Sequence, residues 1–234
     1  MKKILICINI SLLVVIFTGI LFMFLSKSPT VEDVFKKNQN SVVELKSQTG
    51  ESLTSYGSAI FIKEDGTIVS NAHVVTYKQS GVYKEFELYE IRFSFEIDYR
   101  EVTLIKYDLN RDIAILKINN TEDVKYKTIK YADSSKISSG DKVYAIGNGM
   151  NHGIGINEGI ISLPQVNIEY ENNVRNVIQC DLIINEGNSG GALLDSKGRL
   201  IGITTFRLKD YSGNIIYGMA FCIPIRDVID YLNS

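Results

Sequence analysis

The chain has 234 residues, of which 45% are hydrophobic and 22% charged, and its formal net charge is −2. This balance is typical of a folded globular protein, so it excludes a largely disordered chain and gives no basic surface for nucleic acid. Two histidines and three cysteines are too few for a CxxC-type zinc cluster, a His-rich metal centre or a disulfide-dense mini-domain.

The first predicted element is an uncharged, largely apolar run, Ile4–Leu25, which follows Lys2 and Lys3. A helix of this length is about 33 Å long, enough to cross a hydrocarbon core of about 30 Å. A signal peptide usually has a shorter apolar stretch and a small-residue cleavage site, and no Ala-x-Ala pattern follows here. We therefore expect residues 1–28 to be an uncleaved transmembrane anchor, with signal cleavage and secretion as the alternative. Lysines on both sides leave its orientation undecided.

The remainder of the chain has a hydrophobic period near two, which predicts β-strands. Turn residues separate these strands at intervals near ten residues, as in all-β sandwiches and barrels. A short helix is predicted at Val31–Lys37, an exposed hairpin within Tyr77–Tyr99, and a closing helix at Pro224–Asn233. The predicted strands are Ser41–Lys46, Gly57–Ile62, Thr67–Ser70, Phe86–Phe95, Val102–Tyr107, Ile113–Ile118, Lys142–Ile146, Gly159–Leu163, Val177–Ile184, Gly191–Leu194, Leu200–Phe206 and Tyr217–Ile223.

This strand count favours an all-β fold of two six-stranded antiparallel β-barrels with a short C-terminal helix. We expect one domain at residues 29–234, with barrel 1 at about 38–125 and barrel 2 at about 135–225.

The sharpest local motif is Gly187-Asn-Ser-Gly-Gly191. A nucleophilic serine needs an exposed hydroxyl on a tight turn and nearby backbone N–H groups that can stabilise an oxyanion. Glycines on both sides of Ser189 permit such a turn and a close approach of substrate. The plainer interpretation is a glycine-rich turn between two strands.

Two further residues fit a catalytic site with Ser189. His73 follows an apolar strand within Ser70-Asn-Ala-His-Val-Val75, and Asp112 opens the alternating strand Ile113–Ile118. Taken alone, His73 is typical of a packed core histidine and Asp112 of a loop-capping turn residue.

The order of these residues along the chain discriminates among folds. The Ser189 motif also satisfies G-x-S-x-G, but α/β-hydrolases place their histidine after the serine, and both histidines here precede it. A subtilisin order of Asp112, His152 and Ser189 requires a parallel α/β sheet, for which the helices are missing. The order His73, Asp112, Ser189 is that of the chymotrypsin arrangement on two β-barrels.

Several blocks of the sequence, in order, resemble the HtrA/Deg-type trypsin-like serine proteases. These blocks are Gly57–Ile62, Val69–Val75, Asp112–Ile118, Ala145–Asn148, Ile184–Gly191, Gly202–Thr205 and Gly218–Pro224. The resemblance implies a chymotrypsin-like serine endopeptidase that cleaves damaged or specific envelope proteins in protein quality control. It also implies a single-pass membrane protein with its catalytic domain outside the cytoplasm of a bacterium, and a homo-oligomer, a trimer by resemblance. The chain is expected to have no PDZ domain.

The resemblance assigns a role to each site residue. Ser189 attacks the scissile carbonyl, His73 takes and returns the proton, and Asp112 orients the imidazole and stabilises its charged form. The oxyanion hole lies in the loop Gly187, Asn188 and Ser189, with the backbone N–H groups of Gly187 and Ser189 as its donors. This chemistry requires neither metal nor cofactor, and the substrates are polypeptides.

The same resemblance indicates a substrate pocket. The six predicted lining residues are Ile183, Ile184, Thr205, Phe206, Ala220 and Cys222. Thr205 also matches a position whose hydroxyl supports the triad aspartate in this fold. Ala220 replaces a common glycine and Gly149 a common proline.

Other features have plainer interpretations. Cys180 and Cys222 lie on predicted strands of barrel 2 and can be neighbours, as buried free thiols. His152 is expected to be a solvated loop residue. The alternative function is a protease-like binding or chaperone module with a non-competent active site.

Overall fold

The structure is a computed structural model that describes residues 17–18, 28–94, 96–119, 124–170, 173–209 and 215–234. The predicted anchor, residues 1–28, lies almost entirely outside these described residues. Within the described part of the chain, no helix is both long and apolar enough to cross a membrane.

The first helix described in full is α2 (Val31–Asn38), which begins at a capping box. The Thr30 hydroxyl accepts a hydrogen bond from the Asp33 N–H, and the Asp33 carboxylate accepts one from the Thr30 N–H. The buried Asn38 side chain donates to the Gly198 carbonyl oxygen in the second barrel. This bond holds the end of α2 against the second barrel. The 3-10 helix η1 (Gln39–Ser41) follows and leads into the first strand.

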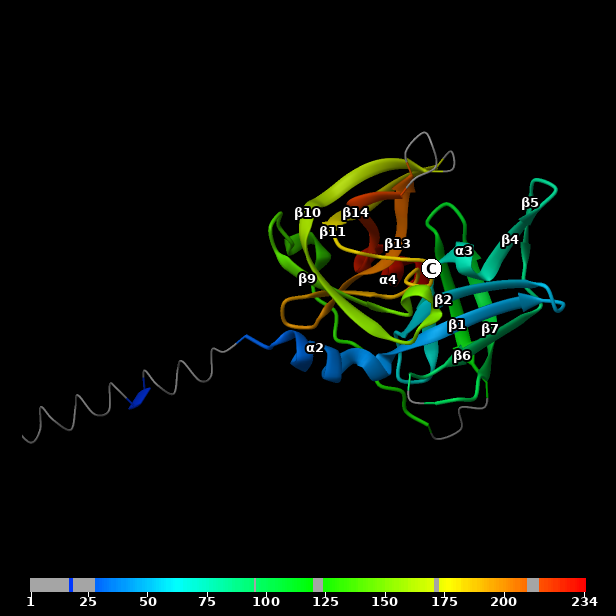
Figure 1. The fold of residues 1–234 in the computed structure, drawn as a ribbon, viewed down its shortest axis with the longest axis horizontal. Helices are drawn as coiled ribbons and strands as arrows, with labels where there is room; N and C mark the ends of the chain where they lie inside the picture. Colours follow the sequence, from blue (N-terminus) through cyan, green and yellow to red (C-terminus); the bar gives the residue numbers. More distant parts are fainter. Residues whose placement is uncertain (1–16, 19–27, 95, 120–123, 171–172, 210–214) are drawn as a thin grey trace, which may run out of the picture.

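Barrel 1 is a closed six-stranded antiparallel barrel with strand order β1-β2-β3-β8-β7-β6. A separate two-stranded hairpin, β4–β5, projects from it beside the short helix α3 (Figure 1). The bounds are β1 (Val42–Thr49), β2 (Leu53–Phe61), β3 (Thr67–Ser70), α3 (Ala72–Val75), β4 (Thr76–Gln79), β5 (Val82–Glu85), β6 (Leu88–Arg92), β7 (Arg100–Asp108) and β8 (Ile113–Ile118).

Barrel 2 is also closed, with strand order β10-β11-β14-β13-β12-β9. The C-terminal helix α4 packs against strands of both barrels, and Lys106 of β7 donates to the Tyr231 carbonyl at its end. The bounds are η2 (Ser134–Lys136), β9 (Lys142–Gly147), η3 (Gly149–Asn151), β10 (Gly155–Tyr170), β11 (Asn173–Asp181), β12 (Ala192–Asp195), β13 (Leu200–Lys209), β14 (Ile215–Pro224) and α4 (Ile225–Asn233).

The predicted all-β fold of two six-stranded barrels with a closing helix is confirmed. Each barrel strand overlaps one of the predicted strands. The largest difference is β10, which extends to Tyr170 instead of ending at Leu163. Its outer part pairs with β11 beyond the barrel, where Val166 and Ile168 pack on Phe206 and Phe221.

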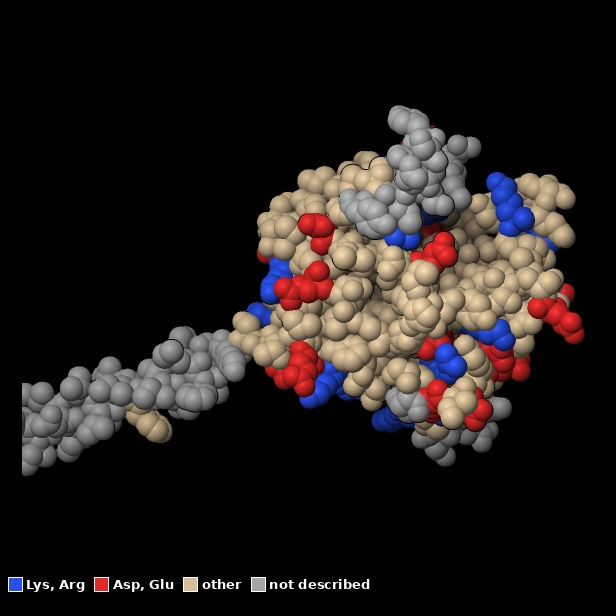
Figure 2. Space-filling view, viewed as in Figure 1, with Lys and Arg blue, Asp and Glu red and all other residues tan. Residues whose placement is uncertain are grey.

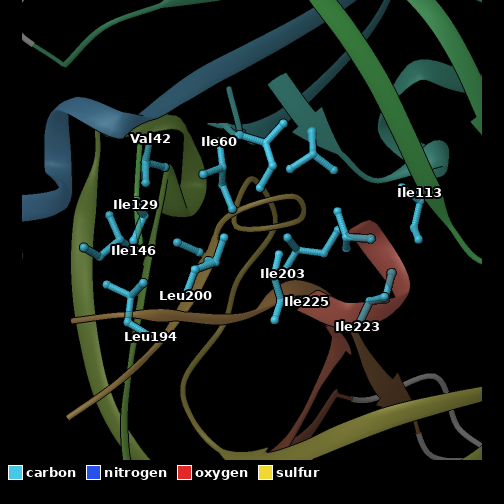
Figure 3. Packing of buried hydrophobic residues seen from close by; sticks show 14 of the residues in the cluster. Val42, Ile60, Ile113, Ile129, Ile146, Leu194, Leu200, Ile203, Ile223 and Ile225 are labelled. Atoms are coloured by element: carbon cyan, nitrogen blue, oxygen red, sulfur yellow. The ribbon is translucent and has the colours of Figure 1, made fainter. Parts of the chain in front are cut away.

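A hydrophobic core lies between the barrels and holds them together (Figure 3). Val42, Ile60 and Ile113 of barrel 1 belong to the same buried cluster as Ile146 and Ile203 of barrel 2. Because packed interiors resist relative movement, this core fixes the loops of one barrel against those of the other. On the face shown in Figure 2, acidic and basic side chains are interspersed.

Candidate active site

His73 lies in the short helix α3, directly after β3. Its neighbours Ala72, Val74 and Val75 are fully buried or nearly so, and they anchor the helix in the core of barrel 1. The His73 side chain points away from that core and is 45% exposed. The packed-core interpretation of this histidine is therefore excluded.

Asp112 lies in the turn between β7 and β8, with a positive φ of 58° that is uncommon outside glycine. Its carboxylate is fully buried. Nδ1 of His73 lies 3.0 Å from Oδ1 and 2.9 Å from Oδ2 of Asp112, and the His73 backbone N–H also donates to Oδ1 at 3.0 Å. Asn71 donates to the Asp112 carbonyl. With Nδ1 held against the carboxylate, Nε2 is the ring nitrogen on the side away from Asp112.

The Asp112 carboxylate is kept ionised by its neighbours. Burial acts to raise its pKa, but the charge and hydrogen bond of His73, the Thr205 hydroxyl and the Arg175 charge together hold the pKa below its usual range.

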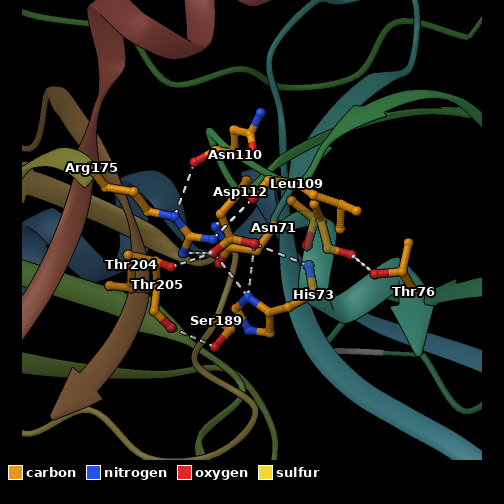
Figure 4. Close-up of polar contacts among 12 residues, drawn as sticks. Asn71, His73, Thr76, Leu109, Asn110, Asp112, Arg175, Ser189, Thr204 and Thr205 are labelled. Carbon is orange, nitrogen blue, oxygen red and sulfur yellow. Dashed lines mark hydrogen bonds and ion pairs between the residues drawn. The ribbon is translucent and has the colours of Figure 1, made fainter. Parts of the chain in front are cut away.

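Ser189 lies in the turn before β12, and its hydroxyl donates a 2.8 Å hydrogen bond to the Thr205 carbonyl. Figure 4 shows this side chain next to the imidazole ring of His73. The serine and the histidine helix approach each other across Gly57: a Cβ there would lie 2.7 Å from a Val74 methyl and 3.1 Å from the Ser189 carbonyl oxygen. Only glycine permits this packing, so Gly57 brings the two segments together.

The loop before Ser189 is held by bonds to both barrels. The Ser58 hydroxyl of β2 donates to the Gly187 carbonyl at 2.7 Å and accepts from the Asn148 N–H at 2.8 Å. The Glu186 carbonyl accepts from the Met150 N–H at 2.7 Å. Since the C=O and N–H of a trans peptide point in opposite directions, the Gly187 N–H faces away from Met150.

The N–H groups predicted to form the oxyanion hole are those of Gly187 and Ser189. In the described part of the chain, the N–H groups of Gly187 and Ser189 donate to no protein acceptor. The Asn188 N–H donates to the Asn185 carbonyl at 3.0 Å, so it closes the turn. Asn188, which was predicted as part of the same loop, therefore uses its N–H for the turn that presents the N–H groups of its neighbours.

Comparison with known proteins agrees with this geometry. A family model described as a trypsin-like peptidase domain matches residues 57–203. The chain belongs to the trypsin-like peptidase family.

The relatives of this chain are HtrA-type proteases. It is 31% identical to the serine protease Do-like HtrA of Lactococcus lactis, over 87% of this chain and 56% of the relative. It is 31% identical to the serine endoprotease DegS of Haemophilus influenzae, over 88% of this chain and 57% of the relative. The chain thus spans about half the length of these curated relatives. The solved HtrA-type protease AlgW with a tripeptide has a TM-score of 0.74 and 29% identity, covering 88% of this chain and 63% of that one.

The predicted substrate-pocket residues separate into two groups. Ile184, Thr205, Phe206, Ala220 and Cys222 are all buried in or beside the core of barrel 2. Ile183 is 64% exposed, so it does not form the base of a closed pocket, contrary to the prediction. The side-chain alternation of β11 continues past its end, and it turns Leu182 and Ile184 inward and Ile183 outward.

Other predicted residues lie as follows. Cys180 and Cys222 are buried free thiols, and a hydrogen bond with Cys180 together with burial raises the pKa of Cys222. His152 follows η3 and is exposed. Among the described residues, no group of three His, Cys, Asp or Glu side chains is placed to hold a metal ion.

Three residues of this site were missed by the sequence analysis. Asn71 and Ser58 lie within the blocks that resemble the HtrA/Deg family, next to residues that were singled out. Arg175 of β11 lies in a cavity beside the triad that His73 and Asp112 also line. Its position two residues before the core residue Val177 places it on the inward face of the strand, which was the only sequence signal for it.

Proposed function

We propose that the chain is a serine endopeptidase of the HtrA type that cleaves polypeptides through an acyl-enzyme. The observation that carries this proposal is the buried Asp112 carboxylate bonded to Nδ1 of His73, beside a serine whose loop presents two N–H groups with no acceptor among the described residues.

The first chemical step starts from Ser189. Rotation about its Cα–Cβ bond turns Oγ from the Thr205 carbonyl toward Nε2 of His73, which accepts the proton as Oγ attacks the scissile carbonyl. Asp112 stabilises the resulting imidazolium, which then protonates the leaving amine. Water hydrolyses the acyl-enzyme by the same route in reverse.

The negative oxygen of the tetrahedral intermediate is stabilised by the N–H groups of Gly187 and Ser189. Each donor of this kind contributes about 3–4 kcal/mol to transition-state stabilisation. The bonds from Ser58 and Met150 hold the loop in place, so this stabilisation requires little rearrangement.

The cellular setting is part of the same proposal. The uncharged run Ile4–Leu25 supports a single-pass anchor at residues 1–28. Similarity to proteins named probable periplasmic serine endoprotease DegP-like supports a catalytic domain outside the cytoplasm. The substrates would then be damaged or specific envelope proteins. The trimer implied by the family resemblance remains a prediction.

Covalent labelling with a fluorophosphonate probe tests the activity. The purified wild-type protein should be labelled and should hydrolyse an unfolded protein such as casein. Ser189→Ala should lose both, and His73→Ala should lose about as much, roughly 10⁶-fold in kcat, because triad members act as a unit. Ser196→Ala changes an exposed serine of the β12–β13 turn and is the matched control.

The alternative is a protease-like binding or chaperone module with a non-competent site. A folded wild-type protein that is neither labelled nor active would favour that module. Undiminished hydrolysis by a clean Ser189→Ala preparation would refute the role of Ser189.

Membrane fractionation tests the anchor. Mass spectrometry of the natively expressed protein should find an intact N-terminus in the membrane fraction. A product processed near residue 29 and released outside the cell would contradict the anchor and support secretion.

A further inference from the structure

Arg175 is a buried cation that spans the two barrels. Its side chain is 7% exposed, although it lies on β11 near the end of a long hairpin. Its Nε donates to the Asn110 carbonyl and its Nη2 to the Leu109 carbonyl, both at 3.0 Å. Its guanidinium also lies over the Phe206 ring, at 5.9 Å from the centroid. An arginine of barrel 2 therefore holds the loop of barrel 1 that carries Asp112.

The same guanidinium contacts the triad carboxylate. Nη1 of Arg175 lies 3.6 Å from Oδ2 of Asp112, the oxygen that is 2.9 Å from Nδ1 of His73. Figure 4 shows the Asp112 carboxylate between the imidazole and the guanidinium. One buried carboxylate thus interacts with the imidazole on one side and a permanent cation on the other, where little water screens the charges.

The backbone conformation of Asp112 indicates that its position depends on such contacts. A non-glycine residue with a φ of 58° costs free energy and persists only where the surroundings hold it. Asn71, in barrel 1, donates to the Asp112 carbonyl, and Arg175, in barrel 2, donates to the carbonyls two and three residues before Asp112.

Other charged groups lie near this carboxylate but do not contact it. Lys78 of β4 and Tyr83 of β5 line the same cavity, and Lys78 Nζ lies over the Tyr83 ring. Arg111 is adjacent in sequence, but its guanidinium pairs with Asp108 at 3.5 Å and is 50% exposed. Besides His73, Arg175 is the charged residue whose contact with the Asp112 carboxylate is shown in the described part of the chain.

We propose that Arg175 is a positioning residue of the triad. It orients Asp112 and offsets part of the negative charge of that carboxylate, so His73 is a weaker base than it would be beside Asp112 without Arg175. This inference rests on the proposed function for its meaning in catalysis. A cation near an imidazole disfavours the imidazolium, so the enzyme would keep His73 neutral, and active as a base, at a lower pH.

An NMR titration of the histidine rings tests this directly. The chain has two histidines, His73 and His152, so a His152→Gln variant assigns the signals. In the Ser189→Ala background, Arg175→Met should move the titration midpoint of His73 upward by about one pH unit. Arg175→Lys, which keeps the charge, should restore most of the wild-type midpoint.

A matched control tests whether the effect is specific to the charge of Arg175 or follows from the loss of any positive charge nearby. Arg111→Gln removes a guanidinium from the same loop without touching Asp112, and it should leave the His73 midpoint and the activity near wild type. A thermal melt of each variant reports whether it folds. If Arg175→Met does not fold, the comparison of Arg175→Lys with Arg175→Gln replaces it.

The outcomes are distinct. In the active protein, the acid limb of kcat/KM against pH should move upward with Arg175→Met by the same amount as the NMR midpoint. An unchanged or lowered midpoint in a folded Arg175→Met protein overturns the proposal, and so does an equal shift in Arg111→Gln. The titration needs no hydrolysis, so its result is independent of whether Ser189 proves to be a nucleophile in the labelling experiment.

Discussion

The Thr205 hydroxyl donates a 2.6 Å hydrogen bond to Oδ2 of Asp112. The carbonyl oxygen of the same residue accepts the hydrogen bond from the Ser189 hydroxyl. Thr205 is 2% exposed and lies on β13, so a rigid strand of barrel 2 contacts both the aspartate of barrel 1 and the serine of barrel 2. The geometry of the triad therefore depends on the packing of the two barrels as well as on the three residues themselves.

Removal of this hydroxyl should slow catalysis without unfolding the protein. Thr205→Val keeps the shape and the backbone carbonyl but removes a hydrogen bond to a buried charge, worth about 1.5–3 kcal/mol. We expect kcat/KM to fall about 10- to 100-fold, with Thr205→Ser close to wild type. Peptide hydrolysis measures the rates, and circular dichroism controls for folding. A wild-type rate in Thr205→Val would show that the Thr205 hydroxyl is not needed to orient Asp112.

A methyl group at Gly187 should damage the oxyanion loop. Gly187 has a φ of 88°, and a Cβ there would lie 2.1 Å from the Asn148 carbonyl oxygen, so Gly187→Ala must displace the loop. Loss of one oxyanion donor lowers kcat by about 10²–10³-fold, which is the expected result.

The control for this variant is Gly140→Ala. Gly140 has a similar φ of 90°, but a Cβ there would meet nothing within 4 Å. Gly140→Ala therefore introduces backbone strain similar to that of Gly187→Ala but no steric clash, and it should leave kcat near the wild-type value. Equal losses of kcat in both variants would assign the effect of Gly187→Ala to general destabilisation.

Substrate preference provides a third prediction. Ile184 and Ala220 are buried near the base of the region predicted as the pocket, so we expect small or medium aliphatic side chains just before the scissile bond. The preference should be graded, because one methylene changes discrimination by about 1–3 kcal/mol. A peptide library measures it, and Ala220→Gly should admit larger residues.

Asp181 is the residue that could reverse this preference. It is exposed, and a Cβ at Gly218 would lie 3.3 Å from its Oδ1. Strong selection for Arg or Lys that disappears in Asp181→Asn would show that this carboxylate lines the pocket.

The sequence predicted the barrels well because their strands have a regular period and clear turn residues. The prediction ended this strand, β10, at Leu163, although exposed Gln165, Asn167 and Glu169 continue to alternate with Val166 and Ile168 beyond it. Pro164 cannot donate a ladder hydrogen bond and is typical of a strand end, so it conceals the continuation that pairs with β11 beyond the barrel.

The contacts between distant residues were harder to predict than the residues themselves. His73, Asp112 and Ser189 were singled out by local motifs and by their order. Arg175 was not, because its role depends on a carboxylate that lies on another barrel. Ile183 was placed near the base of the pocket by its position before Ser189, but the alternation that continues from β11 turns it outward.

The last prediction concerns stability in acid and the turn between β2 and β3. Asp65 accepts hydrogen bonds from the Thr67 N–H at 2.9 Å and hydroxyl at 2.7 Å, and Lys117 Nζ lies 3.0 Å from its Oδ2. Slight burial acts to raise the pKa of Asp65, but these hydrogen bonds and the Lys117 charge outweigh it and lower the pKa to about 2. A carboxyl with a lowered pKa stabilises the folded state above its unfolded pKa of about 4, and this contribution is lost as the pH falls through about 2.

Asp65→Asn should therefore lower the free energy of unfolding at pH 7, and the difference from wild type should shrink between about pH 4 and pH 2. The side chain is 57% exposed, so solvent screening limits the expected loss to about 1 kcal/mol. Urea unfolding at several pH values measures the difference. Asp98→Asn, on the exposed loop between β6 and β7, is the matched control and should show little effect at any pH. A loss in Asp65→Asn that is the same at pH 7 and pH 2 would show that the side chain acts through its shape and not through its charge.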